Sequence, residues 1–266
     1  MFKLGQNSIG FEVKRREFGR QDRGISPKGA NDQTSFITAL SLLAEPKQFK
    51  CFEIFSAREI IFTEKAMFTL TGAHYQEMTL NEKQIDHACV YEANKGDVLK
   101  LTARTKGFRV YLTASKVDSS RIGKKSKAYT HYFPKQHPFI RVTEAPEFDY
   151  LMEDFFKQAY TISSTSDMSG LRLEQKVQAK SYDIITATVT DGTIQLSKDG
   201  PIVLLRHRQS TGGYPRILNV IEADMDRLAQ YPYGTSVRFE LINVEMSVKL
   251  LLEYEKTLLR IKEDLA

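Results

Sequence analysis

One short segment of the sequence gathers side chains that can bind an anion and an amide. The run Arg-His-Arg-Gln-Ser-Thr-Gly-Gly-Tyr-Pro occupies positions 206–215 and directly follows an apolar run at 201–205. Arg208 can hold a carboxylate or a carboxyphosphate through two parallel hydrogen bonds. Gln209 and Thr211 supply neutral donors and acceptors beside it. We therefore assign these three residues a catalytic role in a candidate site.

The glycine pair of the same run favours a close approach of the backbone to a ligand. Gly212 and Gly213 can take left-handed backbone angles and present amide N–H groups to an anion, with Tyr214 next to them. A glycine hairpin with a polar tip is the simpler explanation. Ten polar or turn-forming residues in a row exceed the roughly two to five that a hairpin loop needs, so we favour a binding site.

Two further segments carry candidate site residues. In the first, Asp167 precedes a predicted strand in which Arg172 and Glu174 share one face. Pairing of these two side chains explains the pattern without a ligand, and binding of a substrate carboxylate by Arg172 is the alternative. In the second, a Gly/Pro-rich loop at 24–32 leads into a predicted helix whose N-terminus favours anions. Asp32 either binds substrate there or occupies the position itself as the helix cap.

Spacing excludes several other kinds of site. The five histidines and two cysteines show no zinc-ligand spacing, so no metal is expected. No Gly-x-Ser-x-Gly motif of a hydrolase occurs. The glycine-rich stretch 19–26 has Ile25 where a phosphate-binding loop needs lysine, and no nucleotide motif is present in this chain.

The elements that must position these residues are mostly strands. Short segments rich in β-branched or aromatic residues, separated by turn formers, are typical of a barrel or sandwich; they lie at 11–14, 67–71, 76–80, 98–102, 108–112, 139–142, 171–173, 194–196, 202–205, 216–221 and 236–241. Helices are expected from Asp32 to Pro46, from about Glu147 to Ala159, and from the cap Asn243 to Leu265. Residues 115–138 are interpreted as the connection between two halves.

Composition restricts the class of protein. The 266 residues suit one large domain or two small ones, and no apolar run approaches the roughly 18 residues of a membrane span. The net charge of +5 comes mainly from basic clusters at 14–23 and 121–127, which we interpret as solvated loops. They lack the interleaved aromatics of a nucleic-acid groove, so no nucleic acid partner is expected. The N-terminus resembles no export signal, and only Cys51 and Cys89 are present, which favours the reducing cytoplasm.

Taken together, the segments resemble the biotin-dependent carboxyltransferase-like family. This family comprises the C subunit of bacterial 5-oxoprolinase, allophanate hydrolase subunit 2, the KipA antagonist protein and the matching domain of urea carboxylase. The resemblance rests chiefly on the runs 200–205 and 208–215, and it extends to 166–174, 192–195, 19–32 and positions near 53, 72, 96 and 111.

The resemblance implies a mainly β protein with two cyclophilin-like barrel subdomains, at 1–135 and 136–266, a few helices and a C-terminal helix. It implies a subunit of a complex that opens 5-oxoproline to glutamate at the expense of ATP. The ATP is expected to bind to the complex. The implied partners are a smaller related barrel subunit of the KipI type and a LamB/YcsF-type subunit. Action on a urea-like substrate, with biotin as cofactor, is one alternative. A regulatory binding module of the KipA type without turnover is the other.

Several motif positions depart from the pattern of that family, and four of them bear on the expected activity. Met168 stands in place of an arginine, His207 in place of an aspartate, Asn31 in place of a methionine and Ala187 in place of a glutamate. Loss of one arginine and two acids changes the charge balance of the expected site and its routes for proton transfer.

Overall fold

The computed structural model describes residues 1–132 and 139–265, and the chain divides into two compact units. Unit 1 comprises Met1–Lys14, Asp32–Lys135 and Lys256–Ala266, and unit 2 comprises Arg15–Asn31 and Gln136–Glu255. This division differs from the expected subdomains 1–135 and 136–266 in two segments. Residues 15–31 belong to unit 2, and residues 256–266 belong to unit 1.

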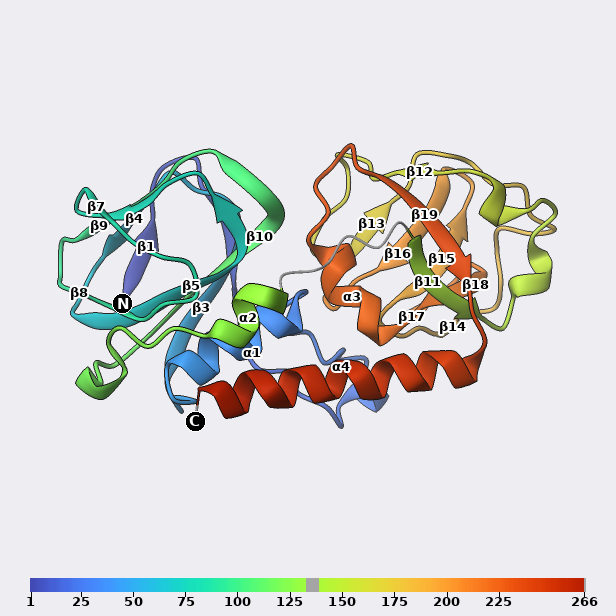
Figure 1. The fold of residues 1–266 in the computed structure, drawn as a ribbon. Helices are drawn as coiled ribbons and strands as arrows, with labels where there is room; N and C mark the ends of the chain where they lie inside the picture. The colour runs from blue at the N-terminus through green and yellow to red at the C-terminus, as the bar shows by residue number, and fades with distance from the viewer. Residues whose placement is uncertain (133–138, 266) are drawn as a thin grey trace. The chain divides into compact units, whose positions relative to one another are not determined.

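Unit 1 contains two five-stranded sheets with antiparallel pairing throughout (Figure 1). Its strands are β1 (Phe2–Leu4), β2 (Ile9–Val13), β3 (Phe49–Ser56), β4 (Glu59–Phe62), β5 (Ala66–Tyr75), β6 (Met78–Leu80), β7 (Lys83–Gln84), β8 (Tyr91–Ala93), β9 (Val98–Leu101) and β10 (Arg104–Ser115). The strand orders are β1-β4-β9-β6-β7 and β2-β3-β10-β5-β8. Alternate side chains of β10, among them Val110 and Leu112, are fully buried in the core between apolar residues of β3 and β5.

Helix α1 (Gln33–Leu42) of unit 1 confirms the predicted helix and its cap. The Asp32 carboxylate accepts a 2.9 Å hydrogen bond from the backbone N–H of Ser35, which satisfies one of the free donors of the first turn. Phe36 and Leu40 of the expected stripe are buried. The helix ends before Ala44 and Glu45, both of which have positive φ angles.

The interpretation of residues 115–138 as a connection between the halves is wrong for the part that the structure describes. Ser115 ends β10, a 3-10 turn follows at Ser119–Arg121, and helix α2 spans Lys127–Tyr132. Tyr129 is buried in a second core of unit 1. Arg121, expected in a solvated loop, donates hydrogen bonds to the carbonyls of Ser41 and Leu42. The Pro134–Pro138 part of the expected connection lies outside the described residues.

Unit 2 is organised around one seven-stranded sheet (Figure 1). Its strands are β11 (Phe139–Glu144), β12 (Tyr160–Thr161), β13 (Gly170–Arg172), β14 (Ala187–Thr188), β15 (Thr193–Ser197), β16 (Gly200–Leu204), β17 (Thr211–Gly212), β18 (Arg216–Val220) and β19 (Ser236–Leu241). The large sheet has the order β12-β19-β11-β18-β15-β16-β13, and β14 pairs with β17 separately. One face of the large sheet packs the core, which includes Leu171, Ile194 and Val203. Helix α3 (Glu222–Ala229) follows β18, and a 3-10 turn at Gln21–Arg23 belongs to the same unit.

The helix expected between Glu147 and Ala159 is wrong. Two 3-10 turns, Phe148–Tyr150 and Phe155–Lys157, occupy this segment. Between them, Leu151 forms an isolated β-bridge with Ala179, which takes the backbone out of helical geometry. The aromatic residues still face the core: the Phe155 ring stacks on Tyr160 at 4.5 Å and contacts Phe239. Their spacing therefore reflects burial of a loop and not of a helix.

Helix α4 (Val244–Asp264), red in Figure 1, confirms the predicted C-terminal helix. Asn243 Oδ1 accepts a hydrogen bond of 2.9 Å from the Met246 N–H, as its capping role requires. Tyr254 and Ile261 of the predicted stripe are buried, whereas Val244 and Val248 are exposed. The mainly β class with few helices and a C-terminal helix is confirmed. Within the described residues, no helix combines the length and the apolar character needed to cross a membrane.

Candidate functional site

Residues 206–215, called the motif loop below, connect β16 to β18, and a short antiparallel ladder holds them in place. Thr211 and Gly212 form β17, which pairs antiparallel with Ala187 and Thr188 of β14. The neighbouring backbone continues this contact, because the N–H of Val189 donates to the carbonyl of Ser210 at 3.0 Å. The segment is therefore a structured loop and not the polar tip of a two-strand hairpin, since β15 separates β16 from β18.

Arg208 is buried, with 7% of its surface exposed. Its Nε donates to Oδ1 of Asp191 at 2.8 Å, and its Nη1 donates to the carbonyl of Gln209 at 2.8 Å. Its Nη2 has no hydrogen-bond acceptor among the described residues. Two of its nitrogens thus fix the guanidinium, and one remains for a ligand oxygen.

Asp191 is the centre of a buried ion cluster that the sequence analysis did not identify. Besides Arg208, it accepts hydrogen bonds from Arg16 and, at 3.5 Å, from Nη1 of Arg206. The prediction that Arg16 lies in a solvated loop is therefore wrong. The only local signal at Asp191 is its position before Gly192, which is also the signature of an ordinary turn.

Arg206, the first residue of the 206–215 segment, adds two more carboxylates to the cluster. Its side chain is fully buried and contacts Glu222 at 2.8 Å and Asp226 at 3.4 Å. Burial alone would lower the pKa of this guanidinium, but the two carboxylates outweigh it and hold the pKa above its ordinary value. Three arginines therefore face three carboxylates, and the cluster is close to electrically neutral.

Two of the departures from the family pattern lie beside this cluster. The side chain of Asn31 accepts a hydrogen bond of 3.0 Å from the Arg206 N–H and donates one of 3.4 Å to the Met168 carbonyl. The carbonyl of Asn31 also accepts from Arg206 Nε at 3.3 Å. Asn31 thus links the 15–31 segment to the loop that follows β16 within unit 2.

Gln195 of β15 connects the motif loop to the sheet. Its Oε1 accepts from Gln209 Nε2 at 3.3 Å, and its Nε2 donates to the Tyr214 carbonyl at 3.3 Å. Gly212 lies directly against it: a Cβ at position 212 would stand 2.5 Å from Gln195 Nε2. A side chain at 212 would therefore require the amide of Gln195 or the loop to move, because that amide fills the space a Cβ would take.

Arg172 lies on the same face of the sheet as Gln195 but two strands away. Arg172 pairs with Ile202, and Ile202 pairs with Gln195, so the three side chains share one face. At a strand spacing of ~4.8 Å, the Arg172 and Gln195 backbones are about 10 Å apart. Gln209 and Gly212 contact Gln195, so the sheet brings this part of the motif and Arg172 to one face without direct contact.

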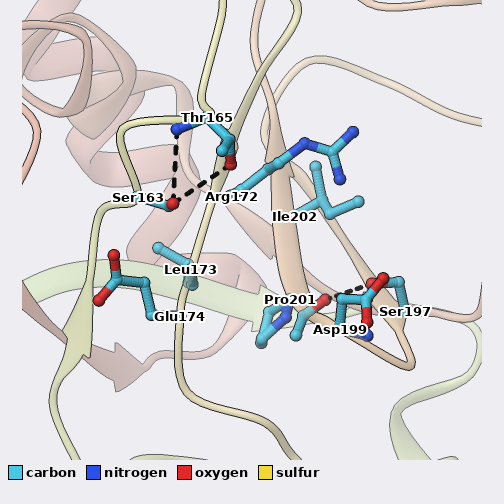
Figure 2. Close-up of a pocket in the computed structure, with 10 residues that line it drawn as sticks. Ser163, Thr165, Arg172, Leu173, Glu174, Ser197, Asp199, Pro201 and Ile202 are labelled. Carbon is cyan, nitrogen blue, oxygen red and sulfur yellow. Dashed lines mark hydrogen bonds between the residues drawn. The ribbon is translucent and has the colours of Figure 1, made fainter.

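Arg172 lines a separate polar cavity of about 330 Å³. Figure 2 shows this cavity between a turn at 163–165, the segment 172–174 and the β15–β16 hairpin. Its lining residues are Ser163, Thr165, Arg172, Leu173, Glu174, Ser197, Asp199, Gly200, Pro201 and Ile202. The simpler expectation, pairing of Arg172 with Glu174, is wrong, because no ion pair joins these two residues and they extend to opposite sides in Figure 2.

Among the described residues, Asp167 and Tyr214 of unit 2 form no hydrogen bond or ion pair with Arg208. Asp167 is exposed and accepts hydrogen bonds from Ser169 and Gly170 in its own turn. Partial burial raises the pKa of Asp167, but these bonds and the charge of Arg172 outweigh it and lower the pKa. Tyr214, within the 206–215 segment, is 41% exposed. Asp32 belongs to unit 1, where it caps α1 and also accepts from the Ser35 hydroxyl at 2.5 Å.

Comparison with known protein families finds a match that covers most of the chain. The model of the carboxyltransferase domain, subdomain A and B, matches residues 23–122 and 114–241. The C subunit of 5-oxoprolinase from Haemophilus influenzae is 26% identical over 273 residues, which cover 88% of this chain and 88% of that protein. The C subunit of 5-oxoprolinase from Escherichia coli is 37% identical over 117 residues, which cover 41% of this chain and 38% of that protein.

A solved structure supports the fold. The K. lactis urea amidolyase matches 98% of this chain with a TM-score of 0.82 and 18% sequence identity. The chain spans 20% of that much longer protein. At this identity the similarity shows the shared fold.

Proposed function

Because the chain belongs to the family of carboxyltransferase domains, subdomains A and B, we propose that it is a subunit of an ATP-dependent complex that opens 5-oxoproline to glutamate. Two curated relatives are named as the C subunit of 5-oxoprolinase, and one of them is similar along 88% of both chains. The observation that carries the proposal is the motif loop itself. It places Arg208 on a buried carboxylate and sets two amide side chains, Gln209 and Gln195, at 3.3 Å from one another.

The proposed roles follow from the donors that the loop offers. Nη2 of Arg208 binds a substrate carboxylate or carboxyphosphate, with Arg172 as the second cation on the same face of the sheet. Gln209 and Thr211 orient the lactam amide. Backbone donors of Gly212 and Gly213 stabilise the oxyanion that forms when the lactam carbonyl is attacked. Tyr214 and Asp167 contribute to substrate binding, and Asp32 acts as the cap of α1 in unit 1.

Because this chain has no nucleotide-binding motif, the complex must supply the ATP site. We assign ATP to the assembled complex and no metal to this chain, and we propose as partners a smaller related barrel subunit of the KipI type and a LamB/YcsF-type subunit. The names of the relatives, which designate one subunit among several, support the existence of further subunits. Buried, unpaired Cys51 and Cys89 support a cytoplasmic location.

Reconstitution tests this proposal directly. The chain is combined with the two partner subunits, ATP and 5-oxoproline, and glutamate release is measured. Arg208→Ala should lower kcat/KM by at least about tenfold, the effect of losing a hydrogen bond to a charged group, and Gln209→Ala by about two- to tenfold, the effect of losing a hydrogen bond to a neutral amide. Gln209 is exposed, so its variant keeps the fold. Arg58→Ala, at an exposed arginine of unit 1, is the control and should retain activity.

Two experimental results would overturn the proposal, and each would favour a different function. Turnover of urea or allophanate with a biotin-carrying partner would make the chain a carboxyltransferase on a urea-like substrate, an interpretation that the fold shared with urea amidolyase supports. Stable binding of the smaller barrel subunit without turnover of 5-oxoproline, urea or allophanate would make it a regulatory module of the KipA type. The replaced residues Met168, His207, Asn31 and Ala187 support that second alternative.

A further inference from the structure

The polar cavity of unit 2 carries three charged side chains that no ion pair neutralises. Arg172, Glu174 and Asp199 all line it, and none of them takes part in an ion pair with another described residue. The cavity is thus not a neutralised part of the protein surface. It offers one positive and two negative groups to a ligand.

The positions of the charges give the cavity a polarity. Arg172 ends β13, and Glu174 lies in the bend that follows, so strand geometry does not hold their side chains on one face. In Figure 2 the guanidinium of Arg172 and the carboxylate of Glu174 extend to opposite sides, and Asp199 approaches from the β15–β16 hairpin. A ligand that satisfies both ends needs opposite charges that are separated along its length.

The rest of the lining suits a short chain of methylene groups. Leu173, Pro201 and Ile202 supply apolar surface between the charged ends. Ser163 and Thr165, whose hydroxyls lie 3.2 Å apart, supply neutral donors and acceptors at one side. A volume of about 330 Å³ is at the lower end of the range of small-molecule sites.

We infer that this cavity binds a small zwitterionic amino acid whose carboxylate and amino group are separated by several bonds. The carboxylate contacts Arg172, and the ammonium group lies between Glu174 and Asp199. The inference goes beyond the proposed function, because binding requires no other subunit, no ATP and no reaction. Glutamate, the product of the proposed reaction, belongs to this chemical class, so product retention or product control would be the consequence.

Titration of the full chain tests this inference. Amide signals are followed by 1H–15N NMR while 4-aminobutyrate, glutarate or butylamine is added; the last two carry only one kind of charge. We expect 4-aminobutyrate to shift the signals of Ser163, Glu174 and Gly200. Glutarate and butylamine should bind at least about tenfold more weakly, since each lacks one charge-assisted contact.

Variants separate the cavity from general surface charge. Arg172→Gln and Glu174→Gln should each weaken binding of 4-aminobutyrate about tenfold. Lys176→Gln, at an exposed cation outside the lining, should leave it unchanged. The inference is overturned if no cavity signal shifts, if butylamine or glutarate binds as tightly as 4-aminobutyrate, or if Lys176→Gln weakens binding as much as Arg172→Gln. None of these results depends on turnover of 5-oxoproline, so the proposed function is tested separately.

Discussion

Asp191 holds Arg208 through a single hydrogen bond of 2.8 Å between Oδ1 and Nε, in surroundings where both side chains are more than nine-tenths buried. The same carboxylate accepts from Arg16 and Arg206, so removal of its charge leaves three arginines against two acids. We expect Asp191→Asn to lower the free energy of unfolding by about 3 kcal/mol, because an uncompensated buried charge is costly. Denaturant unfolding of the full chain measures this.

The control for Asp191→Asn is a carboxylate in a solvent-exposed ion pair. Asp149 lies 3.8 Å from Lys180, and both side chains are largely exposed. Asp149→Asn should change the free energy of unfolding by less than about 1 kcal/mol. Equal losses in the two variants would contradict the role assigned to the buried cluster.

Position 212 tests how closely the motif loop contacts the sheet. Gly212→Ala places a Cβ 2.5 Å from Gln195 Nε2, so either the loop or the amide must move, and we expect a loss of about 1–3 kcal/mol of stability. Gly213→Ala is the matched comparison, since a Cβ there has its nearest neighbour, the Ile184 carbonyl, at 3.8 Å. Thermal unfolding should separate the two variants.

The steric cause can be isolated in a second background. Gln195→Ala removes the side chain that the new Cβ contacts, so Gly212→Ala should cost clearly less stability in that background. A cost that is unchanged there would show that the backbone of the loop, and not Gln195, resists substitution.

The buried histidine of unit 1 predicts a loss of stability in acid. The His87 ring stacks on His74 at 4.2 Å and on Tyr129 at 5.8 Å. Burial, followed by the nearby charges of His74 and Lys125, lowers the pKa of His87 to about 3. The unfolded chain binds this proton near pH 6.5, whereas the folded chain does not until about pH 3, so stability is complete above pH 6.5 and falls towards pH 3.

A substitution shows how much of this pH dependence belongs to His87. His87→Phe keeps an aromatic ring but cannot titrate, and the free energy of unfolding should fall less steeply between pH 6.5 and pH 4 than in the parent chain. Carboxylates contribute to both slopes, so the difference between the two proteins is the relevant quantity. Parallel pH profiles would contradict a neutral, buried His87.

The sequence predicts the helix caps and the strands well because both depend on neighbouring residues. The caps Asp32 and Asn243 each accept a hydrogen bond from a backbone N–H three residues further along the chain, and both bonds are present. The alternation of apolar residues along β10 and β15 is likewise visible in the local sequence. In contrast, the aromatic spacing around Phe155 indicates a helix, while a bridge between Leu151 and the distant Ala179 decides the backbone.

The candidate site shows the same division between local and distant contacts. The composition of the motif at 208–214 is visible in the sequence, but the partner of Arg208 is not, since Asp191 lies in an ordinary turn sequence. Arg16 and Asp191 are 175 positions apart, and no periodic pattern connects them. The proximity of Arg172 to Gln195 follows only from the register of three strands.

The ion pair in unit 1 provides the last prediction. Arg109 Nε donates to Glu53 Oε1 at 2.9 Å, both side chains are fully buried, and the Tyr111 hydroxyl donates to Glu53 Oε2 at 2.9 Å. Arg109→Met leaves a buried carboxylate without its cation, and Glu53→Leu leaves a buried guanidinium, so each should cost about 3–5 kcal/mol.

The double variant Glu53→Leu/Arg109→Met removes both charges and should be more stable than either single variant, because no unpaired charge stays in the core. A double-mutant cycle by denaturant unfolding gives the coupling energy between the two residues. The surface pair of exposed Lys65 and half-buried Glu92, 2.9 Å apart, serves as the reference cycle and should show a coupling below about 1 kcal/mol. A double variant that loses the sum of the two single losses would show that Glu53 and Arg109 contribute independently.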